Sequence, residues 1–140
     1  MATVTGYRRR ARTIALQVLY EIDSVGHPAE STLERHLAEA GPATDTNQYA
    51  RRLVEGVLGR KNEIDQRIAA AAPAWPLDQM AKIDKNVLRL AIFEILFNNT
   101  VPLKAAVNEA VELAKTFGSE NSAKFVNGVL GSIIQQLDRQ

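Results

Sequence analysis

Apolar residues recur at helical spacing along most of the chain, and this constrains the fold more than any other feature of the sequence. In residues 6–23 the apolar positions follow one another every three or four residues, as on one side of a helix. The same spacing returns in residues 48–58, 62–72, 101–117 and 119–137. No segment sustains the alternation of a half-buried strand. The sequence therefore predicts an all-α fold.

Turn-forming residues divide this pattern into six or seven helices. Gly59 predicts a break or a bend between two helical segments, because glycine is costly inside a helix. A short helix is expected around Leu33 and Leu37, and Gly118 is expected to end the helix before it as a C′ residue, with Ser119 capping the next. Residues 83–97 are apolar around most of their circumference, which is typical of a central, buried helix. With 140 residues, a single domain spanning residues 1–140 is expected.

Composition excludes several classes of protein. The chain has no cysteine, so disulfides, thiol catalysis and iron–sulfur ligation are excluded, and a reducing cytoplasm is the expected location. The longest uncharged stretch, residues 125–137, is shorter than the roughly 18 apolar residues of a membrane-spanning helix. We therefore expect a soluble cytoplasmic protein.

The sequence offers no convincing catalytic, cofactor or metal site. The two histidines, His27 and His36, lie in a polar segment without metal-ligand spacing, and we interpret them as solvent-exposed. Glu109 and Glu112 stand one turn apart on a helix that also carries Lys115, which is typical of a solvated face. We expect a protein that is not an enzyme.

A cluster of four arginines near the N-terminus is the strongest functional signal. Arg8, Arg9, Arg10 and Arg12 precede every one of the 16 acidic residues, in a chain of net charge +1. Arginine binds phosphate through charge and bidentate hydrogen bonds, and Tyr20 would offer a stacking surface for an unpaired base. The pattern therefore predicts a nucleic-acid surface. An exposed basic helix turn, with the tyrosine packed under a loop, is the alternative.

At 100° per residue, the face opposite the apolar stripe carries Arg9, Thr13, Leu16 and Tyr20, flanked by Arg12 and Gln17. A second candidate surface lies in residues 114–131, where a polar turn separates two helices. Lysines flank this turn, and a helix N-terminus favours anions. A capped turn without any ligand explains this pattern as well, so the turn alone is only a weak indication of an anion site.

Three stretches carry a family resemblance: RRRARTIALQVLYEID, WPLDQMAKIDKNVLRLAIFEILF and VPLKAAVNEAVELAKTFGSENSAKFVNGVLGSI. Together they resemble the NusB family of bacterial transcription antitermination factors, from Arg8 to about Ile134. The resemblance implies six to seven helices in two small packed bundles. It also implies a protein that binds boxA-type RNA of nascent ribosomal RNA transcripts together with NusE, a small-ribosomal-subunit protein, and helps assemble the antitermination complex on RNA polymerase.

Carried over position by position, the resemblance assigns two sets of residues. The RNA-binding set is Arg8, Arg9, Arg10, Arg12, Gln17, Tyr20, Lys115, Phe117, Gly118, Asn121, Lys124 and Phe125. The set expected to bind NusE is Asp84, Lys85 and Arg89. The chain departs from the common pattern at Asp84, where the family often has Glu, and at Asn121, where an acid is common.

Two other classes of protein are consistent with the sequence. A similar helical domain begins certain ribosomal-RNA cytosine methyltransferases, which continue into a large cofactor-binding domain, and we expect a chain that runs from Met1 to a polar tail at Gln140 to lack that domain. The other is a helical adaptor that binds only proteins, with its arginines merely solvating the surface. Salt-dependent retention of RNA distinguishes the adaptor from an RNA-binding protein.

Overall fold

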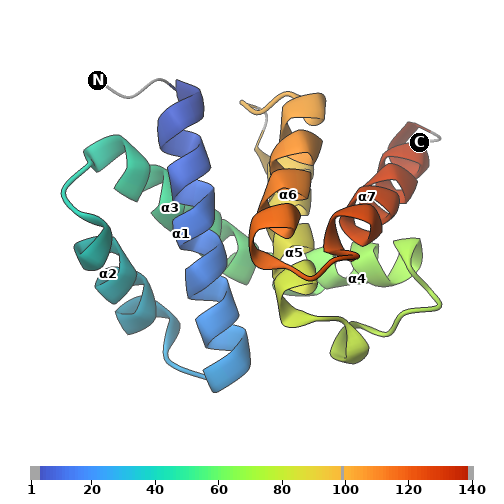
Figure 1. Ribbon diagram of the computed structural model, residues 1–140, viewed down its shortest axis with the longest axis horizontal. Helices are drawn as coiled ribbons and strands as arrows, with labels where there is room; N and C mark the ends of the chain where they lie inside the picture. The colour runs from blue at the N-terminus through green and yellow to red at the C-terminus, as the bar shows by residue number, and fades with distance from the viewer. Residues whose placement is uncertain (1–3, 99, 139–140) are drawn as a thin grey trace. The chain divides into compact units, whose positions relative to one another are not determined.

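The computed structural model describes residues 4–98 and 100–138, in which every regular element is a helix (Figure 1). The elements are α1 (Val4–Val25), α2 (Ala29–Ala40), α3 (Thr44–Gly59), α4 (Lys61–Ala71), the 3₁₀ turn η1 (Leu77–Gln79), α5 (Lys82–Phe97), α6 (Leu103–Phe117) and α7 (Ser122–Asp138). The predicted all-α class is confirmed. The chain divides into two compact units, Met1–Gly59 and Arg60–Gln140.

In the first unit, α1 packs against both α2 and α3. The predicted apolar stripe of α1 is buried from Ala11 to Leu19, and it shares the core with Leu33 of α2 and Leu53 of α3. Helix α2 ends at Ala40 and is followed by Gly41, whose φ of 105° lies in the left-handed region that glycine adopts without strain. This conformation turns the chain toward α3.

In the second unit, α5 contacts α4, α6 and α7. Every residue of α5 from Asp84 to Glu94 is buried, which confirms the prediction of a central helix. Such a helix brings polar side chains into the interior together with apolar ones, and each must then find partners. This requirement shapes the surroundings of Arg89, described below.

Most helix boundaries lie within a few residues of the predicted ones. Helix α3 ends at Gly59, which confirms a break at this position, whereas α6 begins at Leu103, two residues after the predicted start at residue 101. The 3₁₀ turn after Pro76 was not predicted, because three residues carry no helical period. None of the helices in the described part of the chain combines the length and the hydropathy that a membrane span requires.

Candidate nucleic-acid interface

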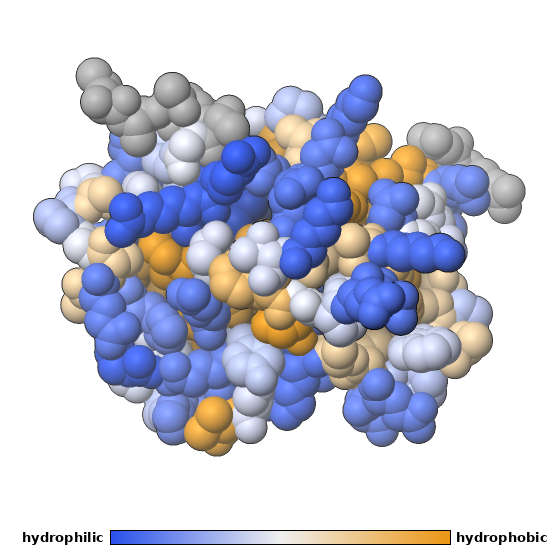
Figure 2. Space-filling model, in the orientation of Figure 1, coloured by the Kyte–Doolittle hydropathy of each residue, from blue (hydrophilic) through white to orange (hydrophobic). Residues whose placement is uncertain are grey.

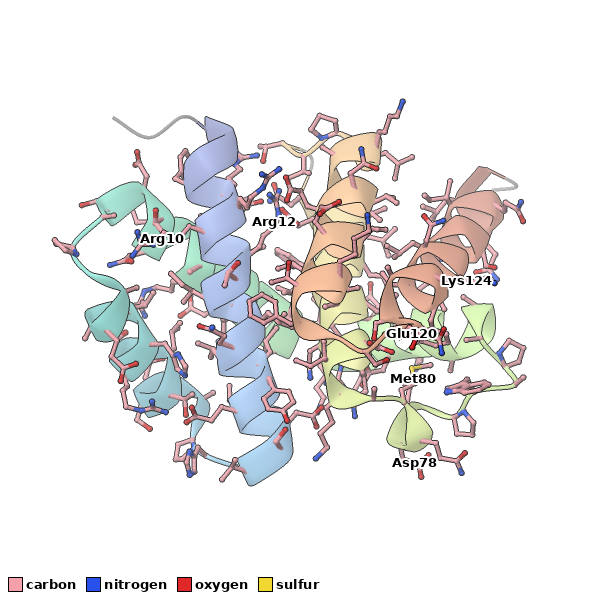
Figure 3. The ribbon with its side chains drawn as sticks, viewed as in Figure 1. Arg10, Arg12, Asp78, Met80, Glu120 and Lys124 are labelled. Atoms are coloured by element: carbon pink, nitrogen blue, oxygen red, sulfur yellow. The ribbon has the colours of Figure 1, made fainter. Side chains whose placement is uncertain are left out.

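The four arginines of α1 point to different sides of the helix. Arg9 and Arg10 are exposed, Arg8 is half-buried, and Arg12 is only 5% exposed. The expectation that Arg12 flanks an outward face is therefore wrong, and Arg8 is only partly accessible. In Figure 3, Arg10 and Arg12 extend from opposite sides of α1.

An aromatic side chain of α3 explains the inward direction of two of these arginines. The guanidinium carbons of Arg8 and Arg12 lie 4.8 Å and 6.0 Å from the ring centre of Tyr49, and the ring of Tyr7 meets Tyr49 edge-on at 6.3 Å. Arg8 and Arg12 stand one turn apart, so both can reach the same ring. Stacking of guanidinium on a ring and burial of the aliphatic stem both favour this arrangement. These two arginines help to hold α1 on α3.

Arg10 is exposed, but it also makes a structural contact. Its Nη2 donates a hydrogen bond to the carbonyl oxygen of Ala40, the last residue of α2. Carbonyls at the end of a helix have no partner within the helix, and a cation is favoured there. Beside this contact, Arg10, Thr13, Gln17 and His36 line part of a hollow of about 270 Å³ between α1 and α2.

The accessible face of α1 is narrower than predicted. Tyr20 is 41% exposed and Gln17 is exposed, whereas Leu16 is buried at 1%. We call Arg9, Arg10, Gln17 and Tyr20 the α1 strip. Its members are spaced so that they follow one side of the helix. Figure 2 shows hydrophilic side chains over the N-terminal half of α1.

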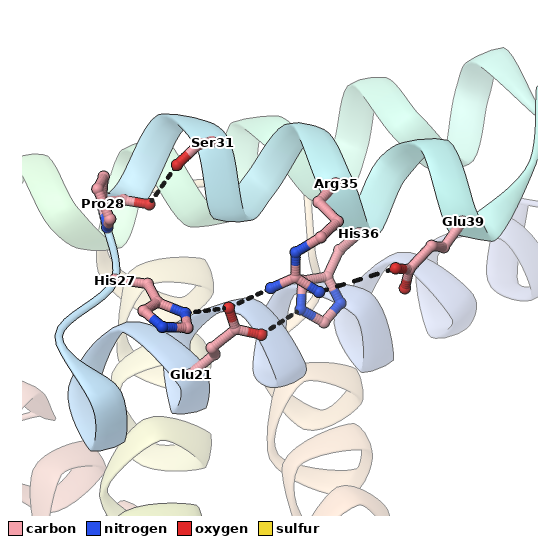
Figure 4. A network of polar contacts seen from close by, with 7 residues as sticks. All are labelled: Glu21, His27, Pro28, Ser31, Arg35, His36 and Glu39. Carbon is pink, nitrogen blue, oxygen red and sulfur yellow. Dashed lines mark hydrogen bonds and ion pairs between the residues drawn. The ribbon is translucent and has the colours of Figure 1, made fainter.

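A polar network that the sequence analysis missed joins α1 to α2 (Figure 4). Glu21 accepts hydrogen bonds from Arg35, from His27 Nδ1 at 2.8 Å and from His36 Nε2 at 3.0 Å. These contacts, above all the one from Arg35, lower the pKa of Glu21 to about 2. The network lies next to Tyr20 in the sequence and holds the C-terminal half of α1 on α2.

The interpretation of both histidines as solvent-exposed is correct only for His27, because the side chain of His36 is 16% exposed. Helical spacing puts Arg35 and His36 on one short helix, but it does not indicate that α1 supplies their acid. No pattern in the sequence therefore indicated that Glu21 lies beside both histidines of the chain. In the described part of the chain, no group of three or more His, Cys, Asp or Glu residues could hold a metal ion.

The turn between α6 and α7 is held by a serine hydroxyl. The amide of Ser119 donates to Ser122 Oγ at 2.8 Å, and the amide of Ser122 donates back to the carbonyl of Ser119 at 3.1 Å. Helix α7 thus begins at Ser122, and the buried Ser122 hydroxyl, rather than a Ser119 cap, fixes the turn.

Gly118 is required here for a reason other than the predicted one. Helix α6 ends before Gly118, as predicted, but the Gly118 φ of −93° is open to any residue, so the turn does not need the left-handed conformation that often favours glycine at a helix end. A Cβ on Gly118 would lie 2.5 Å from Ser122 Cβ and 2.7 Å from the carbonyl oxygen of Ala114. The turn is too tight for any side chain at this position.

The other candidate residues of this region surround the turn. Lys115, Asn121 and Lys124 are exposed, and Phe117 and Phe125 are half-buried. Lys115 Nζ lies 3.5 Å from Glu112 Oε1 in an exposed pair, as the prediction of a solvated face requires. Accessible cations and partly accessible rings therefore lie on both sides of one tight turn.

The three residues expected to bind a protein partner are all buried. Arg89, 5% exposed, donates from Nε and Nη2 to the two carboxylate oxygens of Asp65 at 2.8 and 2.9 Å, and from Nη1 to Asn86 Oδ1 at 3.1 Å. This guanidinium holds α5 on α4 and is not presented on an open surface. By contrast, Asp84 Oδ1 has no hydrogen-bond partner among the described residues.

Comparison with known proteins agrees with the resemblance seen in the sequence. The model of the NusB family matches residues 9–135. A protein of Dehalococcoides mccartyi (strain ATCC BAA-2266 / KCTC 15142 / 195), named transcription antitermination protein NusB, is 49% identical over 134 residues, which cover 96% of this chain and 94% of that protein. A protein of the same name from Chloroflexus aggregans is 46% identical and covers 91% of this chain and 86% of its own length.

Solved structures show the same fold. NusB of T. maritima superposes with a TM-score of 0.86 at 35% identity and covers 97% of this chain and 94% of its own. A chain from the crystal structure of the antitermination factors NusB and NusE in complex with double-stranded RNA gives a TM-score of 0.86 at 30% identity, covering 93% of this chain and 97% of that one. The relatives' names describe a transcription factor rather than an enzyme. With a family model over residues 9–135 and relatives close to half identical over nearly the whole chain, this protein belongs to the NusB family of transcription antitermination proteins.

Proposed function

We propose that the chain binds boxA-type RNA of nascent ribosomal RNA transcripts together with a NusE-type ribosomal protein, and so helps assemble an antitermination complex on RNA polymerase. The α1 strip carries this proposal: two exposed arginines, an amide and a half-exposed tyrosine follow one helix face on which no acid precedes Glu21. Arginine can hold successive phosphates, and an aromatic ring can stack on an unpaired base.

The second RNA-contacting region is the α6–α7 turn with Lys115, Phe117, Asn121, Lys124 and Phe125. Its support is the combination of exposed amines with rings that are partly accessible. Asn121 carries no charge, so it adds no repulsion toward phosphate. Arg8 and Arg12, which stack toward Tyr49, contribute mainly by fixing the direction of α1 and by adding positive potential.

A protein partner is supported by the charge balance and by Asp84. Because the net charge of the chain is only +1, it attracts RNA only close to its basic residues. A second basic surface is therefore needed for tight binding. Asp84 lies in the first turn of α5, next to Lys85, and its buried Oδ1 accepts no hydrogen bond from a described residue. A structural neighbour has been crystallised with NusE and RNA.

A gel-shift experiment tests the proposal directly. The chain is titrated with a boxA-like single-stranded RNA and with a scrambled RNA of equal length, each with and without a NusE-type protein. We expect weak retention by the chain alone and tighter, sequence-dependent retention with the partner. Equal retention of both RNAs in the presence of the partner, or none of either, would overturn the proposal in favour of a purely protein-binding adaptor.

A variant of Asp84 separates the partner role from a structural one. Asp84→Asn keeps the shape and removes the charge. We expect it to weaken binding of the NusE-type protein while RNA binding by the isolated chain stays unchanged. Wild-type affinity for the partner together with a lower melting temperature would instead show that Asp84 acts only as an acid favoured by the helix dipole.

A further inference from the structure

Trp75, the only tryptophan of the chain, is held in place yet lies largely in water. It is 54% exposed, in the segment that links α4 to η1. Its amide donates to the carbonyl of Ala72 at 3.0 Å, and Pro73 and Pro76 restrict the backbone on both sides. A large aromatic side chain on a stiff loop loses little conformational freedom when a ligand packs on it.

The ring of Trp75 lies against a residue of the proposed RNA surface. Its centre is 6.0 Å from that of Phe125, with the two planes inclined at 50°. Phe125 belongs to the first turn of α7 and donates its amide to the carbonyl of Asn121 at 3.1 Å. The two rings therefore form one partly exposed aromatic surface that is continuous with the α6–α7 turn.

The surroundings of the two rings are polar and open. Lys124 is next to Phe125 in the chain, and Lys124 and Asn121 are both exposed. Gly128, about one turn beyond Phe125, has no atom within 4 Å of the place where a Cβ would stand. Figure 3 labels Lys124 and Glu120 near the start of α7, and Met80 in the segment that follows Trp75. The exposed acids Glu120 and Asp78 disfavour an anionic ligand.

We propose that Trp75 and Phe125 form a stacking platform for an unpaired RNA base, with Lys124 contacting a neighbouring phosphate. This inference rests on the proposed function and extends the RNA surface to a segment that the family resemblance did not assign. An aromatic platform next to a cation is a common way to hold single-stranded RNA, because every base presents a π-face and every nucleotide a phosphate. A membrane or an apolar peptide would not need the amine beside the rings.

The single tryptophan makes the proposal measurable without a label. The full chain is titrated with the boxA-like RNA while tryptophan fluorescence is recorded, and binding is measured in parallel by gel shift. We expect the fluorescence of Trp75 to be quenched along the binding curve. Trp75→Ala should weaken RNA binding by about fivefold or more, as for the loss of one stacked base, whereas Trp75→Phe should keep most of the affinity.

Leu103→Ala is the matched control, because Leu103 is also an exposed apolar residue of the same unit. Its RNA affinity should equal that of the parent. If Trp75→Ala proves unfolded, the test rests on the RNA affinity of Trp75→Phe and on the tryptophan fluorescence of the parent protein, because neither measurement requires the alanine variant.

The outcomes separate this inference from the proposed function. If the parent binds the RNA but its fluorescence is unchanged and Trp75→Ala binds equally well, the platform does not exist while the proposed function stands. If Trp75→Ala lowers only the affinity for the NusE-type protein, the surface binds protein and the inference is wrong. If the parent retains no RNA with or without the partner, the proposed function itself fails.

Discussion

Arg89 of α5 binds both carboxylate oxygens of Asp65 of α4, at 2.8 and 2.9 Å, in a pair that is largely removed from solvent. Two parallel hydrogen bonds between charged groups are stronger than a single neutral bond and fix the relative orientation of their helices. The pair thus has a structural role in the second unit, whatever surface α5 presents to a partner.

Removing the acid of this pair should be costly. Asp65→Ala leaves the buried Arg89 guanidinium without its counter-charge, and we expect the free energy of unfolding to fall by about 3 kcal/mol, the lower end for breaking a buried pair. Glu63→Ala is the control on the same helix. Its exposed pair with Arg60 at 3.8 Å should contribute less than about 1 kcal/mol. Equal losses of stability in chemical denaturation of the two variants would contradict the structural role.

A substitution at Gly118 tests the tight turn. Gly118→Ala places a methyl group against Ser122 and the carbonyl of Ala114, and forcing these atoms apart should destabilise the protein by about 1–3 kcal/mol. Gly131→Ala, in the open surface of α7, should instead be neutral or stabilise the helix by up to about 1 kcal/mol. Thermal unfolding of both variants measures these changes in stability. A Gly118→Ala protein as stable as the parent would show that the turn can accommodate a side chain at this position.

The network of Glu21 predicts a specific acid dependence. The pKa of Glu21 is lowered from 4.5 to about 2, so the charged form is favoured by folding. Its stabilising contribution is complete above about pH 4.5 and is lost as the pH falls toward 2. The stability difference between the parent and Glu21→Gln should therefore shrink across this window. A difference that stays constant in denaturation curves over the same window would mean that ionised Glu21 does not support the fold.

Periodicity predicted the helices well because burial of one face sets the sequence pattern of each helix. It predicted the surface less well. The face of α1 opposite the stripe was expected to carry Leu16 and to be flanked by Arg12, yet both are buried. A helical period gives the angle of a residue around its own axis, but not how wide an arc neighbouring helices cover. Likewise, Gly118 was correctly assigned to a helix end, but helical spacing did not indicate that the turn brings Ser122 and the Ala114 carbonyl too close for a side chain at this position.

Tyr20 tests base stacking on the α1 strip. Loss of one stacked base typically costs about 1–3 kcal/mol, so Tyr20→Ala should weaken binding of boxA-like RNA by about tenfold. Tyr20→Phe should retain most of the affinity if the ring stacks, and lose it if the hydroxyl makes the contact. The dependence of affinity on salt should stay nearly constant in both, because no charge is removed. A folded Tyr20→Ala protein with parental affinity would exclude Tyr20 from the interface.

The salt dependence of RNA affinity in Arg9→Ala shows whether the α1 strip holds RNA through its phosphates. Arg9 lies on the α1 strip, and the control, Arg52→Ala, removes the same charge from an exposed position on α3. Binding of the boxA-like RNA is measured over a series of salt concentrations for both variants and the parent. We expect the slope of log affinity against log salt to become shallower in Arg9→Ala, by about 0.7 for each phosphate that the arginine neutralises in the parent, and to stay at the parental value in Arg52→Ala. Identical slopes in all three proteins would contradict the assignment of the α1 strip as the surface that holds RNA.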